Sequence, residues 1–178
     1  MRFTAHDGHP FAAAHHAPGM PRRHWLMKSE PAEASIDDLV RAPLGTLPWT
    51  GVRNYQARNF MRDLMQPGDG VLFYHSSCPE PGIAGLARIA GPAQPDATQF
   101  DPASPYFDPK ATPAQPRWLQ IDVALERKTR LLSLAELREH AALATMQVLR
   151  RGNRLSITPV SDAEWRAVLA LLDDPGRR

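Results

Sequence analysis

Apolar positions along the chain predict five strands. The clearest covers residues 119–125, where Leu119, Ile121 and Val123 alternate with polar or small residues, as in a strand with one buried face. The other predicted strands cover residues 24–29, 71–76, 82–89 and 154–158. We expect 82–89 to pair antiparallel with 71–76, because only a short proline-containing loop separates them.

Capping residues and helical spacing predict helices between these strands. Apolar residues at i, i+3, i+4 and i+7 follow Asn54, and serines open capping-box patterns at three further places. The predicted helices begin after Ser35, Asn54, Ser133 and Ser161, and another helical piece covers 143–149. Short strands interleaved with helices, without regular βαβ alternation, predict an α+β fold with a mixed or antiparallel sheet curled into a small barrel.

Two segments lack these patterns. Residues 91–117 are rich in proline and carry Phe100, Tyr106 and Phe107, so we expect a long loop that packs onto the domain. Residues 1–19 hold four of the seven histidines without periodicity. We interpret them as a disordered extension or as the result of a start codon placed upstream of Met20, because their irregular spacing disfavours a metal site. The domain then covers 20–178.

Composition narrows the class of protein. The chain has 178 residues, 43% of them hydrophobic and 22% charged, with a net charge of +2. This mild basicity permits a polyanionic partner. One cysteine excludes an internal disulfide, and no apolar run has the length of a membrane span. Abundant arginine and alanine indicate a GC-rich bacterial source, so we expect a cytoplasmic protein, a monomer without a membrane partner.

Residues 49–62 contain the highest concentration of side chains suited to binding a ligand. Trp49 offers a flat stacking face, and Gly51 permits a close backbone approach or a positive φ. Arg53 and Asn54 add planar, directional hydrogen-bonding groups. Together they could hold a flat molecule with polar edges, such as a nucleobase. A helix cap beside a buried tryptophan explains the same residues, and both interpretations stay open at this point.

Signatures of catalysis are missing. The chain has no Gly-rich phosphate loop, no H-E-x-x-H, no C-x-x-C and no G-x-S-x-G. His75 and Cys78 are close in sequence, but a strand-end histidine beside a small residue explains them better than a catalytic dyad. Two groups of basic residues are consistent with solvated rims, or with phosphate contacts beside one bound base. These groups are Arg127, Lys128 and Arg130, and Arg150, Arg151 and Arg154. We therefore predict no enzyme and no cofactor.

Several longer motifs occur together in order. They are Trp25-Leu26-Met27-Lys28-Ser29-Glu30-Pro31, the run from Trp49 to Phe60, Phe73-Tyr74-His75-Ser76, Pro81-Gly82-Ile83-Ala84-Gly85, Pro95-Asp96, Tyr106-Phe107-Asp108-Pro109 and Arg154-Leu155-Ser156-Ile157-x-Pro159. Because it carries these motifs in this order, the sequence from His24 to Leu172 resembles the EVE domain family of the PUA-like superfamily, to which the YTH readers also belong. The family usually has tyrosine before the Pro-Asp pair, where this chain has Gln94.

The resemblance implies a small, strongly bent PUA-like β-barrel with peripheral helices. It also implies non-catalytic binding of nucleic acid that carries a modified base, with methylated or hydroxymethylated cytosine in DNA as the usual proposal. Trp49 and either Phe73 or Tyr74 are candidates for stacking, while polar and backbone groups would meet the base edge or phosphate. The candidate ligand-binding residues are Lys28, Ser29, Glu30, Trp49, Gly51, Val52, Arg53, Asn54, Tyr55, Phe73, Tyr74, His75, Asp96, Arg154 and Ser156.

Three alternatives remain at this stage. A reader of modified RNA would use stacked single-stranded bases and the 2′-hydroxyl, and nothing in the sequence separates it from a DNA reader. A sensor of a free nucleobase or nucleotide would bind with little dependence on salt. A hydrolase acting on a modified nucleotide would need a base near the pocket, for which His75 is the only candidate.

Overall fold

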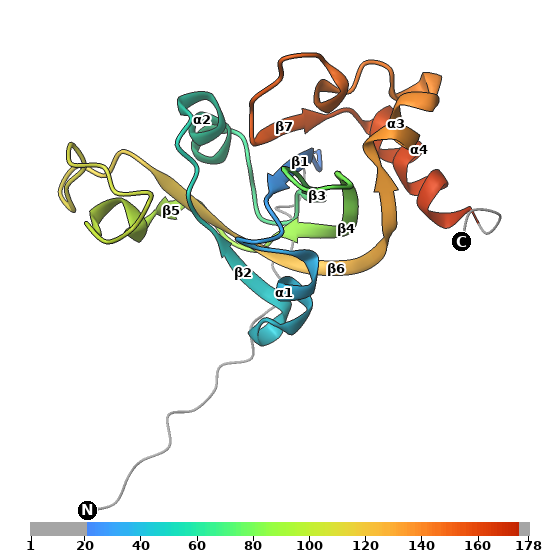
Figure 1. Ribbon diagram of the computed structural model, residues 1–178. Coiled ribbons are helices and arrows are strands. Elements are labelled where there is room, and N and C mark those ends of the chain that lie inside the picture. Colours follow the sequence, from blue (N-terminus) through green and yellow to red (C-terminus); the bar gives the residue numbers. More distant parts are fainter. Residues whose placement is uncertain (1–20, 175–178) are drawn as a thin grey trace, which may run out of the picture.

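The computed structural model describes residues 21–174, which form a mixed sheet with helices on both faces (Figure 1). The strands are β1 (His24–Ser29), β2 (Thr46–Trp49), β3 (Gly70–His75), β4 (Gly82–Ile89), β5 (Gln94–Pro95), β6 (Leu119–Ser133) and β7 (Ile157–Val160). The α-helices are α1 (Ile36–Arg41), α2 (Tyr55–Asp63), α3 (Leu134–Glu139) and α4 (Asp162–Asp173). Four 3₁₀ segments connect them: η1 (Pro43–Gly45), η2 (Ala97–Phe100), η3 (Ala141–Leu143) and η4 (Gln147–Leu149). The prediction about residues 1–19 lies outside the described residues.

The strand order is β2-β6-β4-β3-β1-β7, with β5 paired to the start of β6. Strands β1 and β3 pair in parallel, and the other pairs are antiparallel. Strand β6 spans 15 residues and curves through the molecule, so that one strand joins β2, β4 and β5 (Figure 1). Register shifts along the β4–β6 pair mark bulges, which bend a strand and increase its twist.

The α+β class and the mixed sheet are confirmed, whereas the predicted barrel is wrong because the sheet is open. Its edges are β2 and β7, which are not paired with each other in the described part of the chain. Each edge strand has four residues and contains a proline, Pro48 or Pro159. Proline has no backbone N–H to donate to a further strand, so it is typical of sheet edges.

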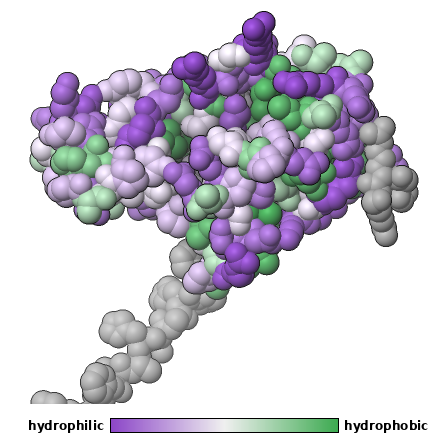
Figure 2. All heavy atoms as spheres, viewed as in Figure 1, coloured by the Kyte–Doolittle hydropathy of each residue, from purple (hydrophilic) through white to green (hydrophobic). Residues whose placement is uncertain are grey.

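Alternate side chains of the central strands β1 and β3 point into two separate hydrophobic cores, one on each face of the sheet. Trp25 and Met27 of β1 pack with Phe73 of β3 under α1 and α2, whereas Leu26 packs with Tyr74 under α3 and α4. Burial on both faces explains why these two strands contain nearly continuous apolar runs. On the face shown in Figure 2, hydrophobic residues form patches between hydrophilic ones.

The capped helices agree with prediction. Ser35 and Ser161 each form a complete capping box, with Asp38 and Glu164 respectively, and Ser133 accepts a hydrogen bond from the Glu136 amide. The predicted pairing of 82–89 with 71–76 is confirmed as the β3–β4 pair. No helix within residues 21–174 is long and apolar enough to cross a membrane.

Three element boundaries differ from prediction. Strand β7 begins at Ile157 rather than 154, because the Asn153 side chain accepts from the Leu155 amide (2.9 Å) and holds that segment as a turn. The helical piece at 143–149 is instead η3 and η4, separated by Met146 with extended backbone. Strand β6 continues eight residues past the predicted end at 125, first through the exposed residues 126–128 and then to Leu132, which is buried in the second core.

Candidate nucleobase pocket

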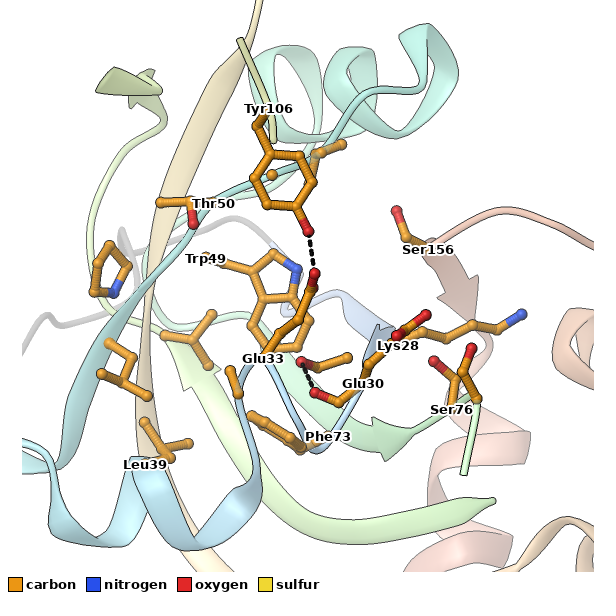
Figure 3. A pocket seen from close by; sticks show the side chains of 18 of the residues that line it. Lys28, Glu30, Glu33, Leu39, Trp49, Thr50, Phe73, Ser76, Tyr106 and Ser156 are labelled. Atoms are coloured by element: carbon orange, nitrogen blue, oxygen red, sulfur yellow. Dashed lines mark hydrogen bonds between the residues drawn. The ribbon is translucent and has the colours of Figure 1, made fainter. Parts of the chain in front are cut away.

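A pocket of about 630 Å³ opens between the ends of β1 and β2, helix α1, strand β3 and the loop that carries Tyr106 (Figure 3). Its size lies within the range of about 300–1,000 Å³ that is usual for small-molecule sites. Nine of the fifteen candidate residues line it: Lys28, Ser29, Glu30, Trp49, Gly51, Val52, Phe73, Arg154 and Ser156.

Two aromatic rings form the deep part of the pocket. The Trp49 and Phe73 ring centroids are 5.2 Å apart, with an angle of 76° between the ring planes. The edge of one ring therefore meets the face of the other, a favoured aromatic geometry. Leu39 and Val123 are fully buried and pack behind these rings. Trp49 is only 9% exposed, and its Nε1–H makes no hydrogen bond within residues 21–174, so it is available as a donor.

Gly51 allows Tyr106 to cover the pocket. Gly51 has φ +77°, and a Cβ at this position would lie 2.7 Å from Cζ of Tyr106. Any larger residue would therefore displace the ring. The Tyr106 hydroxyl donates to Oε1 of Glu33 (2.5 Å), a bond drawn between two lining residues in Figure 3. This hydrogen bond to a carboxylate raises the pKa of Tyr106 to about 12, so the phenol stays protonated.

Arg53 and Asp96 lie behind the pocket and hold its backbone. Asp96 Oδ2 accepts from the Gly51 amide (2.9 Å) and from Nη1 of Arg53 (2.8 Å). Arg53 also donates to the Tyr106 carbonyl from Nε (2.9 Å) and Nη2 (2.6 Å). Burial alone would raise the pKa of Asp96, but hydrogen bonds from Thr98, Arg53 and Gly51 outweigh it and lower that pKa. The pair thus positions Gly51 and Tyr106 rather than lining the pocket.

Asn54 and Tyr55 also lie outside the pocket lining. Asn54 is the N-cap of α2, because its Oδ1 accepts from the amides of Gln56 (2.9 Å) and Ala57 (3.1 Å). Tyr55 stacks on Trp118, with ring centroids 4.9 Å apart. The helix-cap interpretation of Asn54 is therefore observed directly.

Tyr74 and His75 do not line the pocket and have structural contacts instead. Phe73 faces the pocket, so its neighbour Tyr74 points into the second core, where burial raises the pKa of Tyr74 to about 12. His75 Nε2 accepts from the Ile36 amide (3.0 Å) and thereby caps α1. Burial lowers the pKa of His75, which favours the neutral ring that this acceptor role requires. Nε2 is therefore occupied, and only Nδ1 is left for any pairing with Cys78.

The polar lining combines hydrogen-bond donors with two carboxylates, those of Glu30 and Glu33. Burial lowers the pKa of Lys28, whose Nζ lies 3.5 Å from the Asn153 carbonyl oxygen. Ser29 Oγ donates to the Glu30 carbonyl (3.4 Å), while the Glu30 carboxylate makes no hydrogen bond within the described residues. Arg154 is exposed at the pocket and has no ion pair in the described chain.

Of the two groups of basic residues predicted from the sequence, only one is paired with acidic residues in the described chain. Arg127 pairs with Asp173 (2.7 Å), Lys128 with Asp37 (2.5 Å), and Arg130 with Glu136 (2.8 Å). Arg150, Arg151 and Arg154, by contrast, form no ion pair within residues 21–174. Only the second group leaves free positive charge, and it lies on the side of the pocket where Arg154 is part of the lining.

Residue-level reasoning missed ten lining residues: Glu33, Ala34, Leu39, Leu47, Pro48, Thr50, Ser76, Ser77, Tyr106 and Val123. Tyr106 had a signal, because it belongs to a loop predicted to pack down and to one of the quoted motifs. The apolar members have the pattern of ordinary core residues, so their role depends on which segments meet. Gln94 lies exposed on β5, paired with Gln120, and does not line the pocket. The described residues contain no group of three or more His, Cys, Asp or Glu placed to hold a metal ion.

Comparison with known proteins identifies the family and agrees with the fold. The EVE domain matches residues 23–171, and the chain belongs to this family. Human thymocyte nuclear protein 1 is 45% identical over 165 residues, which cover 83% of this chain and 73% of the human protein.

Solved structures agree as well. The crystal structure of the human protein in complex with DNA containing 5-methylcytosine has 43% identity and a TM-score of 0.80, and covers 85% of this chain and 98% of that chain. A Pseudomonas syringae protein has 49% identity and a TM-score of 0.79, covering 83% and 98%. A Zygosaccharomyces rouxii YTH domain in complex with N6-methyladenosine RNA has 13% identity and a TM-score of 0.52, covering 89% and 88%, and shares the fold alone.

Proposed function

We propose that this protein is a non-catalytic reader of a modified base in DNA, with methylated or hydroxymethylated cytosine as the ligand. The observation that carries the proposal is the aromatic pocket built on Trp49 and Phe73, in a chain 43% identical to a protein crystallised with DNA containing 5-methylcytosine. Its volume of about 630 Å³ suits one extruded base with room for a substituent.

Reading requires that the base leave the stack. Extrusion costs a few kcal/mol, of which aromatic contacts recover about 1–3 kcal/mol per base. Trp49 would supply those contacts, with Phe73 packed against its ring from within the core. The free Trp49 Nε1–H is available to a polar base edge. A binding role also fits His75, whose Nε2 is occupied by the Ile36 amide.

Backbone phosphates would meet the exposed arginines beside the pocket. Arg154 lines the pocket, and Arg150 and Arg151 lie in the turn just before it. Because none has an ion pair in the described chain, each is available to replace the counterions of a phosphate.

The test is binding to one short DNA series with cytosine, 5-methylcytosine or 5-hydroxymethylcytosine at a central position. Each oligonucleotide is measured single- and double-stranded at two salt concentrations by fluorescence anisotropy. We expect a preference for a modified base, and a Trp49→Phe variant that binds it about three- to tenfold more weakly through loss of one hydrogen-bond donor and stacking area.

Trp165→Phe is the matched control, because Trp165 is also a buried indole but packs in the second core, away from the pocket. It should bind as the unmodified protein does. Equal binding of all three bases by the unmodified protein, with Trp49→Phe unchanged, would overturn the DNA proposal. The same series in RNA and with free nucleobases then decides between the remaining binding classes, because free nucleobases bind with little salt dependence.

A further inference from the structure

Glu30 stands out in the pocket as a carboxylate without a partner. Its backbone carbonyl accepts from the amides of Glu33 (2.8 Å) and Ala34 (3.0 Å), which fixes the turn after β1. Its side chain is exposed, lines the pocket and makes no hydrogen bond within residues 21–174 (Figure 3). The turn therefore uses the main chain of Glu30 and leaves the carboxylate open to a ligand.

The second pocket carboxylate is engaged. Oε1 of Glu33 accepts from the Tyr106 hydroxyl at 2.5 Å. Of the two, only Glu30 has both carboxylate oxygens free of a contact with another side chain in the described residues.

The other polar groups around the ligand space can donate. Lys28 and the Trp49 Nε1–H are donors only, and the hydroxyls of Ser29 and Ser156 can do either. A carboxylate, by contrast, accepts only when ionised. A carboxylate with both oxygens free, in the same lining as several donors, matches a pyrimidine that presents an exocyclic amine next to acceptor atoms.

Cytosine has this pattern, with an N4 amine, whereas thymine and uracil place a carbonyl oxygen at the same position. A keto pyrimidine would direct that oxygen at the Glu30 carboxylate, leaving two acceptors face to face. 5-Methylcytosine and thymine carry the same 5-methyl group, so stacking and methyl packing contribute little to a difference between them.

We propose that Glu30 is the specificity-determining residue of the pocket and accepts a hydrogen bond from the exocyclic amine of the bound base. The pocket then takes an amino pyrimidine and rejects its keto counterpart. This inference rests on the proposed function, because it assigns one contact within the same site.

The experiment compares four single-stranded oligonucleotides that differ at one central position: cytosine, 5-methylcytosine, thymine or an abasic site. The unmodified protein should bind the 5-methylcytosine strand about tenfold more tightly than the thymine strand. Glu30→Gln should narrow this ratio to about threefold or less, because an amide can donate to the thymine O4 as readily as it accepts from the amine.

Glu139→Gln is the control, because Glu139 is an exposed glutamate at the end of α3 and does not line the pocket. It removes the same negative charge, so any general gain in affinity for a polyanion appears in both variants. It should keep the tenfold ratio. Urea unfolding of both variants confirms that they fold.

The outcomes separate the inference from the proposed function. Two results would show that the role of Glu30 is wrong while base reading stands. In the first, the protein prefers 5-methylcytosine to cytosine but binds the thymine strand as tightly as the 5-methylcytosine strand. In the second, Glu30→Gln keeps the tenfold ratio between the 5-methylcytosine and thymine strands. If the unmodified protein binds all four strands alike, including the abasic one, the proposed function itself fails and takes this inference with it.

Discussion

Gly51 and Gly152 have nearly the same backbone conformation and very different surroundings. Their φ values are +77° and +80°, in the left-handed region where glycine has no Cβ penalty. A Cβ on Gly152 would meet nothing within 4 Å, whereas one on Gly51 would collide with the Tyr106 ring. The two positions therefore separate backbone strain from the requirement for close packing at the pocket.

Alanine at each position should show this difference. Gly152→Ala should lower the free energy of unfolding by about 1 kcal/mol, the usual cost of a left-handed conformation for a residue with a Cβ. Gly51→Ala should cost at least about 1 kcal/mol more, because the Tyr106 ring has to move as well. Urea denaturation of both variants measures the difference. Equal losses in the free energy of unfolding would show that the Tyr106 ring moves aside without destabilising the fold.

At the level of elements, one ion pair joins the start of α2 to the long loop. Arg53 precedes α2 and Asp96 caps η2, and both contact the segment that carries Gly51 or Tyr106. The Asp96 side chain is fully buried and that of Arg53 is 22% exposed. The loop predicted to pack onto the domain thus does so through a buried, charge-assisted network rather than through apolar contacts alone.

Removing one partner should leave the other charge uncompensated. We expect Asp96→Asn to lower the free energy of unfolding by about 3 kcal/mol at pH 7. Asp173→Asn is the control, because it breaks a surface pair with Arg127 (side chains 57% and 46% exposed) and should change stability by less than about 1 kcal/mol. Similar losses in the two variants would contradict a special role for the buried pair.

The same variant gives a pH dependence with a defined sign. The folded-state pKa of Asp96 is lowered, so its contribution to stability is complete above the unfolded value of about 3.9 and is lost as pH falls through the folded value. The stability difference between the unmodified protein and Asp96→Asn should therefore be constant from pH 7 to about 5 and shrink below about 4. Unfolding midpoints across this range provide the measurement, and a difference that grows on acidification would contradict it.

At the level of the whole molecule, charge is distributed unevenly around a mildly basic chain. The Arg127–Arg130 stretch is matched by acidic partners, while Arg150, Arg151 and Arg154 keep free positive charge beside the pocket. A net charge of +2 understates this asymmetry. Local unpaired charge, rather than net charge, is what would attract a nucleic-acid backbone to this side.

Arg154→Ala should therefore weaken binding of modified and unmodified DNA by the same factor. It should also reduce the slope of log affinity against log salt by about one, as expected for the loss of one phosphate contact. Arg166→Ala on α4 is the control, because Arg166 is exposed over the second core and should leave the slope unchanged. An altered base preference with an unchanged slope would place Arg154 against the base instead.

Local patterns in the sequence were sufficient for elements whose signals are local. Serine caps, the apolar spacing of α2 and the apolar runs of β1, β3 and β4 appear where expected, because capping and burial on a single element need no partner to be recognised. Strands β2 and β7 were missed or misplaced, because four residues with a proline form a strand only when a neighbouring strand supplies the pairing.

The pocket, too, was predictable from the sequence only in part. Residue chemistry pointed to Trp49 and Gly51, since an aromatic face and a glycine are informative on their own. Whether Phe73 or Tyr74 faces the pocket was decided by the register of β3 against β1 and β4. The meeting of Glu33 with Tyr106, 73 residues apart, and the free carboxylate of Glu30 depend on how the turn after β1 and the long loop pack. Hydrogen bonds between distant segments leave no periodic pattern in a sequence, so only the tertiary structure determined them.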